Sequence, residues 1–177
     1  MFPGASIAGQ PVTTDRRVTR TIDLPEDHYT LFNATRDDLP EVIVVNDALL
    51  TFPHTDLFAW HLRVRLDAKE LAENGMPTAQ ESQRLFAVGD RIEEVVLGGR
   101  TSSGARNALF LARSTWNELR ELYYCVHDPE IAHAALQALI ESGHHERHWE
   151  YEMKHDPQWH EAGWIFRLFP LANGPDG

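Results

Sequence analysis

Nine residues, FAWHLRVRL at 58–66, alternate between apolar and polar side chains and constrain the fold more than any other stretch. Successive side chains of a strand point to opposite faces of a sheet, so this alternation predicts a half-buried strand. The buried face would carry Phe58, Trp60, Leu62, Val64 and Leu66. The polar face would carry His61, Arg63 and Arg65.

A helix is predicted after this strand. TAQE at 78–81 has the pattern of a capping box, in which the Thr78 side chain accepts a hydrogen bond from the Glu81 amide while Glu81 reaches back. Apolar residues then recur at helical spacing from Leu85 to Val95, and Gly98 is expected to end the helix.

Turn, cap and alternation signals predict the remaining elements in the same way. They indicate a hairpin over 108–126, a helix over 128–143, a strand within 145–153 and a short helix that ends at Pro170. From residue 58 the order is therefore strand, helix, strand, strand, helix, strand. This order predicts an α+β fold with a ferredoxin-like βαββαβ antiparallel sheet, two helices covering one face.

The expected domain organisation has four parts. Residues 1–12 are predicted to be a disordered tail and 171–177 a polar tail. Residues 13–57 would form an N-terminal β-hairpin subdomain, with a strand at 18–24 and a hairpin over 28–47. Residues 58–170 would form the ferredoxin-like domain, and the N-terminal hairpin would extend its sheet or lean on its open face.

Composition narrows the classes of function. Sixteen basic and twenty-seven acidic residues give a formal net charge of −11, which repels phosphate backbones and anionic lipid. We therefore expect no direct contact with nucleic acid or membrane, and a basic protein partner is electrostatically easier. The single cysteine, Cys125, excludes an intramolecular disulfide and a cysteine cluster for zinc. The first eleven residues lack the pattern of a signal peptide, and no apolar run reaches membrane-spanning length, so a cytoplasmic location is expected.

The stretch SGHHERHWEYEMKHDPQWH, at 142–160, holds five of the ten histidines and raises the question of a metal site. Zinc proteases place H-E-x-x-H on a helix, but here the glutamate is displaced by one position and Gly143 has just ended a helix. Metal binding stays open as an alternative. Its ligands would be His144, His145 and His148 with Glu146 or Glu150.

An extended backbone explains the same residues without a ligand. On a strand, Trp149, Tyr151 and Met153 would face the core, and His148, Glu150 and Glu152 would face outward. In a ferredoxin-like sheet the last strand lies beside the first. The outward face would then pair His148, Glu150 and Glu152 with His61, Arg63 and Arg65, as a cross-strand ladder of charges.

Other candidates for chemistry are weaker. GGRTSSG, within 98–104, lacks the order of a phosphate-binding loop and indicates a flexible turn. Cys125 with His127 could suggest a thiol nucleophile, but a lone strand cysteine is more often a small buried hydrophobe. Trp116, at a hairpin tip, is either a contact anchor or packed beneath the N-terminal hairpin.

Four segments of the chain resemble the bacterial domain-of-unknown-function family 695: HYTLFNA…PEVIVVNDALL, LRVRL, NGMPTAQESQRLFAVGDRIEEVV and TWNELRELYYCV. The most specific of them is N-G-[LM]-P-T-x-x-E, at Asn74 to Glu81. The C-terminal part, HDPEIAHAAL…HWEYEMKHDPQW…LFP, resembles a module shared by that family and the regulator of ribonuclease E activity B. Together the resemblance covers about residues 28–170.

The resemblance implies a ferredoxin-like fold for the second part of the chain. It carries no agreed catalytic residues, and the ribonuclease regulator acts by binding its enzyme. The chain departs from the family pattern at Trp116-Asn117-Glu118, where an Asn-Gly turn is common, and in a longer GGRTSSGARNA loop.

Two hypotheses of function follow. The first is a non-catalytic protein-interaction or regulatory domain without a cofactor. Its candidate surface comprises His61, Arg63, Arg65, Trp116, Tyr123, His148, Glu150 and Glu152. The second is a metal-binding protein or metal-dependent hydrolase that uses the His144–His148 cluster. A homodimer through an exposed sheet edge is compatible with either, and no residue pattern fixes it.

Overall fold

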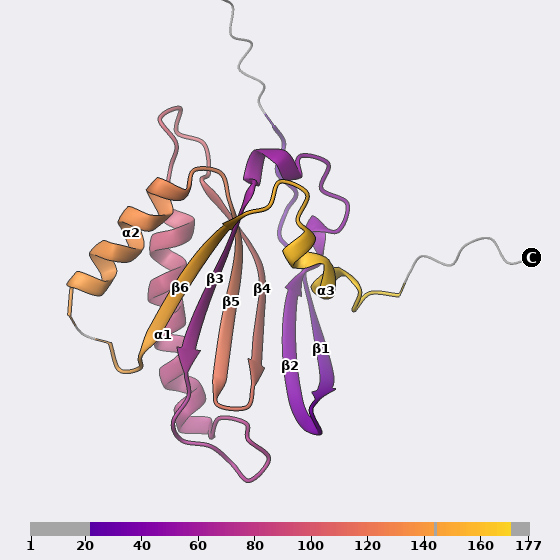
Figure 1. Cartoon of the computed structure of the whole chain (residues 1–177), viewed down its shortest axis with the longest axis vertical. Helices are drawn as coiled ribbons and strands as arrows, with labels where there is room; N and C mark the ends of the chain where they lie inside the picture. Colours follow the sequence, from indigo (N-terminus) through magenta and orange to yellow (C-terminus); the bar gives the residue numbers. More distant parts are fainter. Residues whose placement is uncertain (1–21, 144, 171–177) are drawn as a thin grey trace, which may run out of the picture.

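A computed structural model describes residues 22–143 and 145–170 of the chain. Within them the alternating stretch forms β3, Trp60–Asp67, whose Leu62, Val64 and Leu66 are inaccessible to solvent. This strand lies between two others in an antiparallel sheet with the order β1-β2-β4-β5-β3-β6 (Figure 1). The other strands are β1 (Tyr29–Arg36), β2 (Leu39–Asn46), β4 (Ala108–Trp116), β5 (Leu119–Val126) and β6 (Trp149–His155).

Helices α1, Ala79–Gly98, and α2, Pro129–Glu141, cover one face of the sheet, as predicted (Figure 1). Leu85, Val88 and Ile92 of the α1 stripe are buried in one core cluster with residues of β3, β5 and β6, whereas Val95 is only partly buried. Asp128 caps α2 by accepting a hydrogen bond from the Glu130 amide at 3.0 Å. The protein therefore has an α+β architecture built on a six-stranded antiparallel sheet.

The N-terminal hairpin extends the sheet and does not lean on its open face. Strand β2 pairs with β4 over Glu41 to Val45, and β1 forms the outer edge. The hairpin consequently shares one sheet with the strands from residue 60 onward. The predicted tails, 1–12 and 171–177, lie outside the described residues.

A second core lies on the sheet face away from α1 and α2. Two 3-10 helices, Asp47–Leu49 and Thr55–Phe58, pack there together with the C-terminal helix α3, Gly163–Phe166. Asp156 holds the entry to this C-terminal segment, because its carboxylate accepts hydrogen bonds from the amides of His160 and Glu161. The segment covers one half of this face and leaves the half nearer the hairpin turns open (Figure 1).

Three predicted boundaries are wrong. Phe58 lies in a 3-10 helix and packs in the second core, because the strand begins only at Trp60. Residues 22–24 form no strand, and the rest of the stretch expected at 18–24 lies outside the described residues. Strand β6 begins at Trp149 and not at His145, because Arg147 turns away toward α1.

Only half of the predicted capping box forms. The Thr78 hydroxyl accepts from the Glu81 amide at 3.2 Å, as expected. The Glu81 carboxylate does not reach back to Thr78, whose own amide donates to the Glu70 carbonyl. It accepts instead from the Lys69 amide and from the Arg147 guanidinium, so this helix start is tied to the beginning of β6.

Both tight hairpins turn through two residues in the left-handed region. The φ angles are 49° and 63° at Asp37 and Asp38, and 34° and 66° at Asn117 and Glu118. Such turns favour Asn-Gly, because glycine adopts positive φ without a steric penalty. Glu118 is therefore the least suited residue of the four.

Replacing Glu118 by glycine is expected to raise the free energy of unfolding by about 0.5–1 kcal/mol, since the relief of left-handed strain exceeds the added chain entropy. The hydrogen bond from the Ala68 amide to the Glu118 carbonyl uses only backbone and should persist. Urea unfolding measures the difference. Glu118→Ala is the control, because it removes the side chain but keeps the strain; an equal gain from alanine would contradict this account.

Candidate interaction surface

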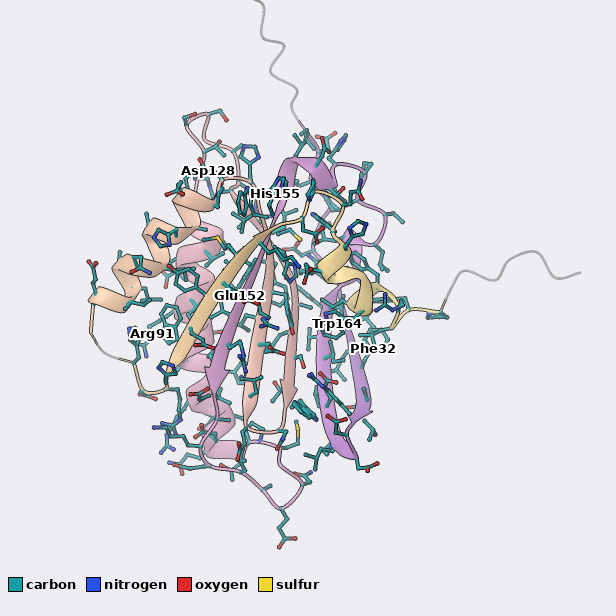
Figure 2. The ribbon with its side chains drawn as sticks, in the orientation of Figure 1. Phe32, Arg91, Asp128, Glu152, His155 and Trp164 are labelled. Atoms are coloured by element: carbon teal, nitrogen blue, oxygen red, sulfur yellow. The ribbon has the colours of Figure 1, made fainter. Side chains whose placement is uncertain are left out.

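The open half of the sheet face carries a row of alternating charges that runs across three strands. We call it the charged strip, and it consists of Arg63 and Arg65 on β3, Glu121 on β5, and Glu150 and Glu152 on β6. Figure 2 labels Glu152 on β6 and Trp164 in the helix that covers the other half of the face. The five charged residues of the strip lie together on the half of the face that the C-terminal segment does not cover.

The strand register brings the predicted outward-facing charges of β3 and β6 together. Arg63 lies opposite Glu152 and Arg65 opposite Glu150. Their side chains form ion pairs, with Arg63 Nη2 2.8 Å from Glu152 Oε1 and Arg65 Nη1 3.4 Å from Glu150 Oε1. These two pairs confirm the predicted ladder of charges.

The predicted place of His61 and His148 in this ladder is wrong. His61 lies opposite Lys154. His148 precedes β6, so its side chain is not part of the ladder. The backbone carbonyl of His148 accepts a hydrogen bond from the Asp67 amide at 3.0 Å. The prediction failed because β6 begins only at Trp149, which pairs with Leu66, so His148 lies beyond the ladder.

Glu121 joins the two arginines from the other side. Its Oε1 lies 3.7 Å from Arg63 Nη1 and 3.8 Å from Arg65 Nε, and its side chain is only 8% exposed. The Tyr123 hydroxyl donates to Glu121 Oε2 at 2.8 Å. Burial raises the pKa of Tyr123, and the adjacent Glu121 carboxylate raises it further, so the hydroxyl remains a donor. The Glu121 carboxylate thus lies between the two guanidinium groups and carries the charge opposite to theirs.

The outer members of the strip are open to solvent. The side chains of Glu150 and Glu152 are 62% and 66% exposed, and those of Arg63 and Arg65 are 35% and 41% exposed. Together with Tyr151 they line a hollow of about 180 Å³. A partner can therefore reach charges of both signs, and the two arginines among them lie next to Glu121.

A polar extension continues the strip toward β1. The Ser114 hydroxyl donates to Glu41 Oε1 at 2.6 Å, and both residues are buried. Arg36 lies 3.6 Å from the same carboxylate, and its guanidinium is 4.1 Å from the centre of the Trp116 ring. Trp116 donates its indole N–H to the Arg36 carbonyl. The half-buried Trp116 therefore packs at the end of the hairpin, as one of the two interpretations of this residue expected.

Two predicted surface residues are covered. His61 and Tyr123 are 9% and 4% exposed, and the Tyr123 ring packs edge-on against Trp164 at 5.6 Å. Burial lowers the pKa of His61, and the nearby carboxylates Glu161 and Asp156 oppose that shift only in part. A partner that meets the open half cannot touch these two side chains unless the C-terminal segment moves.

The histidines near residue 145 do not converge. The His145 ring packs edge-on against Trp149 at 5.4 Å, while His148 is exposed. His144 lies outside the described residues. Within 22–143 and 145–170 no group of three or more histidine, cysteine or carboxylate side chains is arranged to hold a metal ion.

Cys125 is inaccessible to solvent in the second core, and burial raises the pKa of its thiol well above the usual value. The thiolate is therefore disfavoured at neutral pH, and Cys125 behaves as a small buried hydrophobe. The nearby His127 is engaged elsewhere, with Nδ1 2.5 Å from the Leu57 carbonyl.

A family model described as a family of unknown function, DUF695, matches residues 27–161. The chain belongs to the DUF695 family. This match confirms the family resemblance found in the sequence, while no comparison supports the module related to the ribonuclease regulator. No curated protein and no solved structure was found to match this DUF695 chain. Among its described helices none is both long and apolar enough to cross a membrane.

Sequence reasoning missed Glu121, the residue that organises the strip of this DUF695 protein. The signal was present, because Glu121 stands two positions before Tyr123 and must share its face of β5. The alternation of ELRELYYCV is masked by apolar residues on both faces, so the carboxylate resembles an ordinary solvated charge. Its burial comes from β3 and β4 on either side, which the local pattern does not contain.

Proposed function

We propose that this DUF695 protein is a non-catalytic protein-interaction domain that binds its partner through the charged strip. The observation that carries the proposal is the contrast between the two halves of one sheet face. The half that the C-terminal segment covers is apolar, and the open half presents exposed charges held in fixed positions.

Energetics favour a binding role for these pairs over a structural one. Exposed ion pairs contribute about 0–1 kcal/mol to stability, so Glu150 and Glu152 add little to the fold. Charges that are pre-positioned across an interface steer association and select partners, because a misplaced like charge costs several kcal/mol. The net charge of −11 favours a partner that offers basic side chains to the exposed carboxylates.

The element order supports a finer description of the fold as part of the same proposal. Strands β4-β5-β3-β6, with helices after β3 and β5, follow the split βαβ order of a ferredoxin-like unit, which the hairpin then extends at β4. The resemblance of the C-terminal part to the regulator of ribonuclease E activity B is in keeping with binding, because that regulator acts by binding. A cytoplasmic location and a bacterial protein as partner complete the proposal.

Charge reversal of the strip tests the proposal. The double variant Glu150→Lys, Glu152→Lys should lose its partner by about tenfold or more, since two attractive contacts become repulsive. The matched control is Glu94→Lys, Glu141→Lys, which makes the same change in net charge on exposed positions of α1 and α2. Immobilised wild type and both variants are incubated with bacterial lysate, and retained proteins are quantified by mass spectrometry.

The decisive result is a protein that wild type and the helix-side variant retain and the strip variant does not. Crosslinks from that protein should map to β3 and β6. If all three forms retain the same proteins equally, or if none retains a specific protein, the charged strip is not a binding surface. Thermal unfolding of the strip variant checks that its fold is unchanged.

A further inference from the structure

A cavity of about 590 Å³ lies at the end of the sheet opposite the hairpin turns. Three segments that are distant in sequence form its walls: 22–24, 54–58 and the loop at 101–106, with His127 at the end of β5. The loop between α1 and β4 is the one that projects beyond the sheet at the top of Figure 1. The sequence indicates that this loop is longer than its counterpart in the family pattern. The proposed binding through the charged strip gives the loop no role.

The loop is held by hydrogen bonds within it, whereas the sequence indicated a flexible turn. Arg100 and Arg106 form an antiparallel bridge, and the Thr101 amide donates to the Ala105 carbonyl at 2.9 Å. The Thr101 hydroxyl contacts Ser103 at 2.9 Å and accepts from the Ala105 amide. Gly104, with a φ of 82°, closes the turn where other residues would be strained. These contacts fix one wall of the cavity before any ligand binds.

Apolar side chains line the opposite side. Ile22, Leu24 and Leu57 are half-buried, and Phe58 is 6% exposed. The His127 imidazole anchors this side, because its Nδ1 can only donate to the Leu57 carbonyl. Its other ring nitrogen, Nε2, is thereby left for a ligand. Cavities of this size with an apolar wall and a few polar groups are typical of small-molecule sites.

One cation of the wall, Arg106, makes no ion pair among the described residues. Its side chain is half-buried, and within the same part of the chain its guanidinium makes no side-chain hydrogen bond. The single carboxylate of the lining, Asp56, is exposed, so solvent screens its charge. His54 adds a half-buried imidazole on the same rim. In a protein with a net charge of −11, the cavity is a local site that favours an anion.

We infer that this cavity binds a small amphipathic carboxylate, with the apolar body against Leu57 and Phe58 and the carboxylate on Arg106. Guanidinium groups bind carboxylates through paired, charge-assisted hydrogen bonds. The inference stands apart from the proposed function, because the cavity and the charged strip share no residue.

Octanoate is a suitable probe, and 1-octanol and octylamine are its neutral and cationic counterparts. In ¹H–¹⁵N NMR titrations, octanoate should give saturable shifts at the amides of 101–106, Leu57 and His127, and none at Glu150 or Glu152. Octanol should bind about tenfold more weakly because it lacks the charge-assisted contact, and octylamine more weakly still.

Variants at two arginines of the same loop locate the head group. Arg106→Gln should weaken octanoate binding about tenfold and leave octanol binding unchanged. Arg100→Gln is the control, since it makes the same charge change on a side chain that does not line the cavity and binds the carbonyls of Leu97 and Gly99. The inference is overturned if octanoate shifts other regions or none, or if Arg106→Gln affects octanoate no more than Arg100→Gln does.

Discussion

Glu81→Gln is expected to lower the free energy of unfolding by about 3 kcal/mol, because it removes the closest counter-charge of a largely buried guanidinium. The Glu81 side chain is inaccessible to solvent, and the Arg147 side chain that pairs with it is 11% exposed. Arg147 Nε donates to Glu81 Oε1 at 2.6 Å, and the Lys69 amide donates to the same oxygen at 2.9 Å. Glutamine keeps the shape but removes the charge. Urea unfolding monitored by tryptophan fluorescence measures the loss.

Glu70→Gln is the matched control. Glu70 pairs with Arg84 and lies 3.9 Å from Arg147 Nη2, but its side chain is 46% exposed. Exposed pairs contribute about 0–1 kcal/mol, so the control should unfold nearly as wild type does. Equal losses from the two variants would show that burial does not set the strength of the Glu81–Arg147 contact.

Acid unfolding offers an independent readout of this contact. Hydrogen bonds from Arg147 lower the pKa of Glu81 from 4.5 to about 2, against the opposing effect of burial. A carboxyl with a lowered pKa in the folded state stabilises the fold above its unfolded pKa, and this stabilisation is lost as the pH falls. The difference in stability between wild type and Glu81→Gln should therefore be constant above about pH 5 and shrink between 4.5 and 2. A difference that is independent of pH would contradict the charged contact.

The Glu81–Arg147 contact also explains where sequence reasoning reached its limit. In the sequence both residues have a local interpretation, Glu81 as half of a capping box and Arg147 as part of a strand. Each interpretation used only neighbours within a few positions, whereas the two residues are 66 positions apart and meet in space. A cap pattern predicts the helix start correctly through Thr78, but it cannot reveal that a buried carboxylate prefers a distant guanidinium.

Strand periodicity had more predictive power, for a physical reason. Side chains alternate strictly along a strand, so the outward faces of β3 and β6 could be predicted, and the structure pairs their charges as Arg63–Glu152 and Arg65–Glu150. The alternation does not determine the strand register or the burial of a face. His61 lies opposite Lys154 and is buried beside the C-terminal segment. Both features depend on tertiary packing, which a period of two does not encode.

The second large effect on stability concerns the C-terminal segment that packs on this face of the sheet. Trp159→Ala is expected to cost about 4 kcal/mol of unfolding free energy, as for other large buried aromatic residues. Trp159 is 4% exposed, stacks on Phe52 at 5.7 Å and on Phe166 at 6.3 Å, and donates its indole N–H to the Phe58 carbonyl at 2.9 Å. Its removal leaves a cavity between the 3-10 helices and the C-terminal segment. Urea unfolding monitored by circular dichroism measures the cost.

Trp159→Phe separates the ring from the hydrogen bond. Phenylalanine keeps one aromatic ring for stacking but loses the donor to Phe58 and part of the buried ring area, so it should cost about 1–2 kcal/mol, less than alanine. The pKa of His61, followed by NMR, then distinguishes detachment of the segment from a general loss of stability. Burial lowers this pKa in the wild type, so detachment in Trp159→Ala should raise it toward 6.5, whereas Trp159→Phe should keep it low. An unchanged His61 pKa in Trp159→Ala would mean that the segment stays on the sheet without its central ring, and that Trp159 does not hold the cover in place.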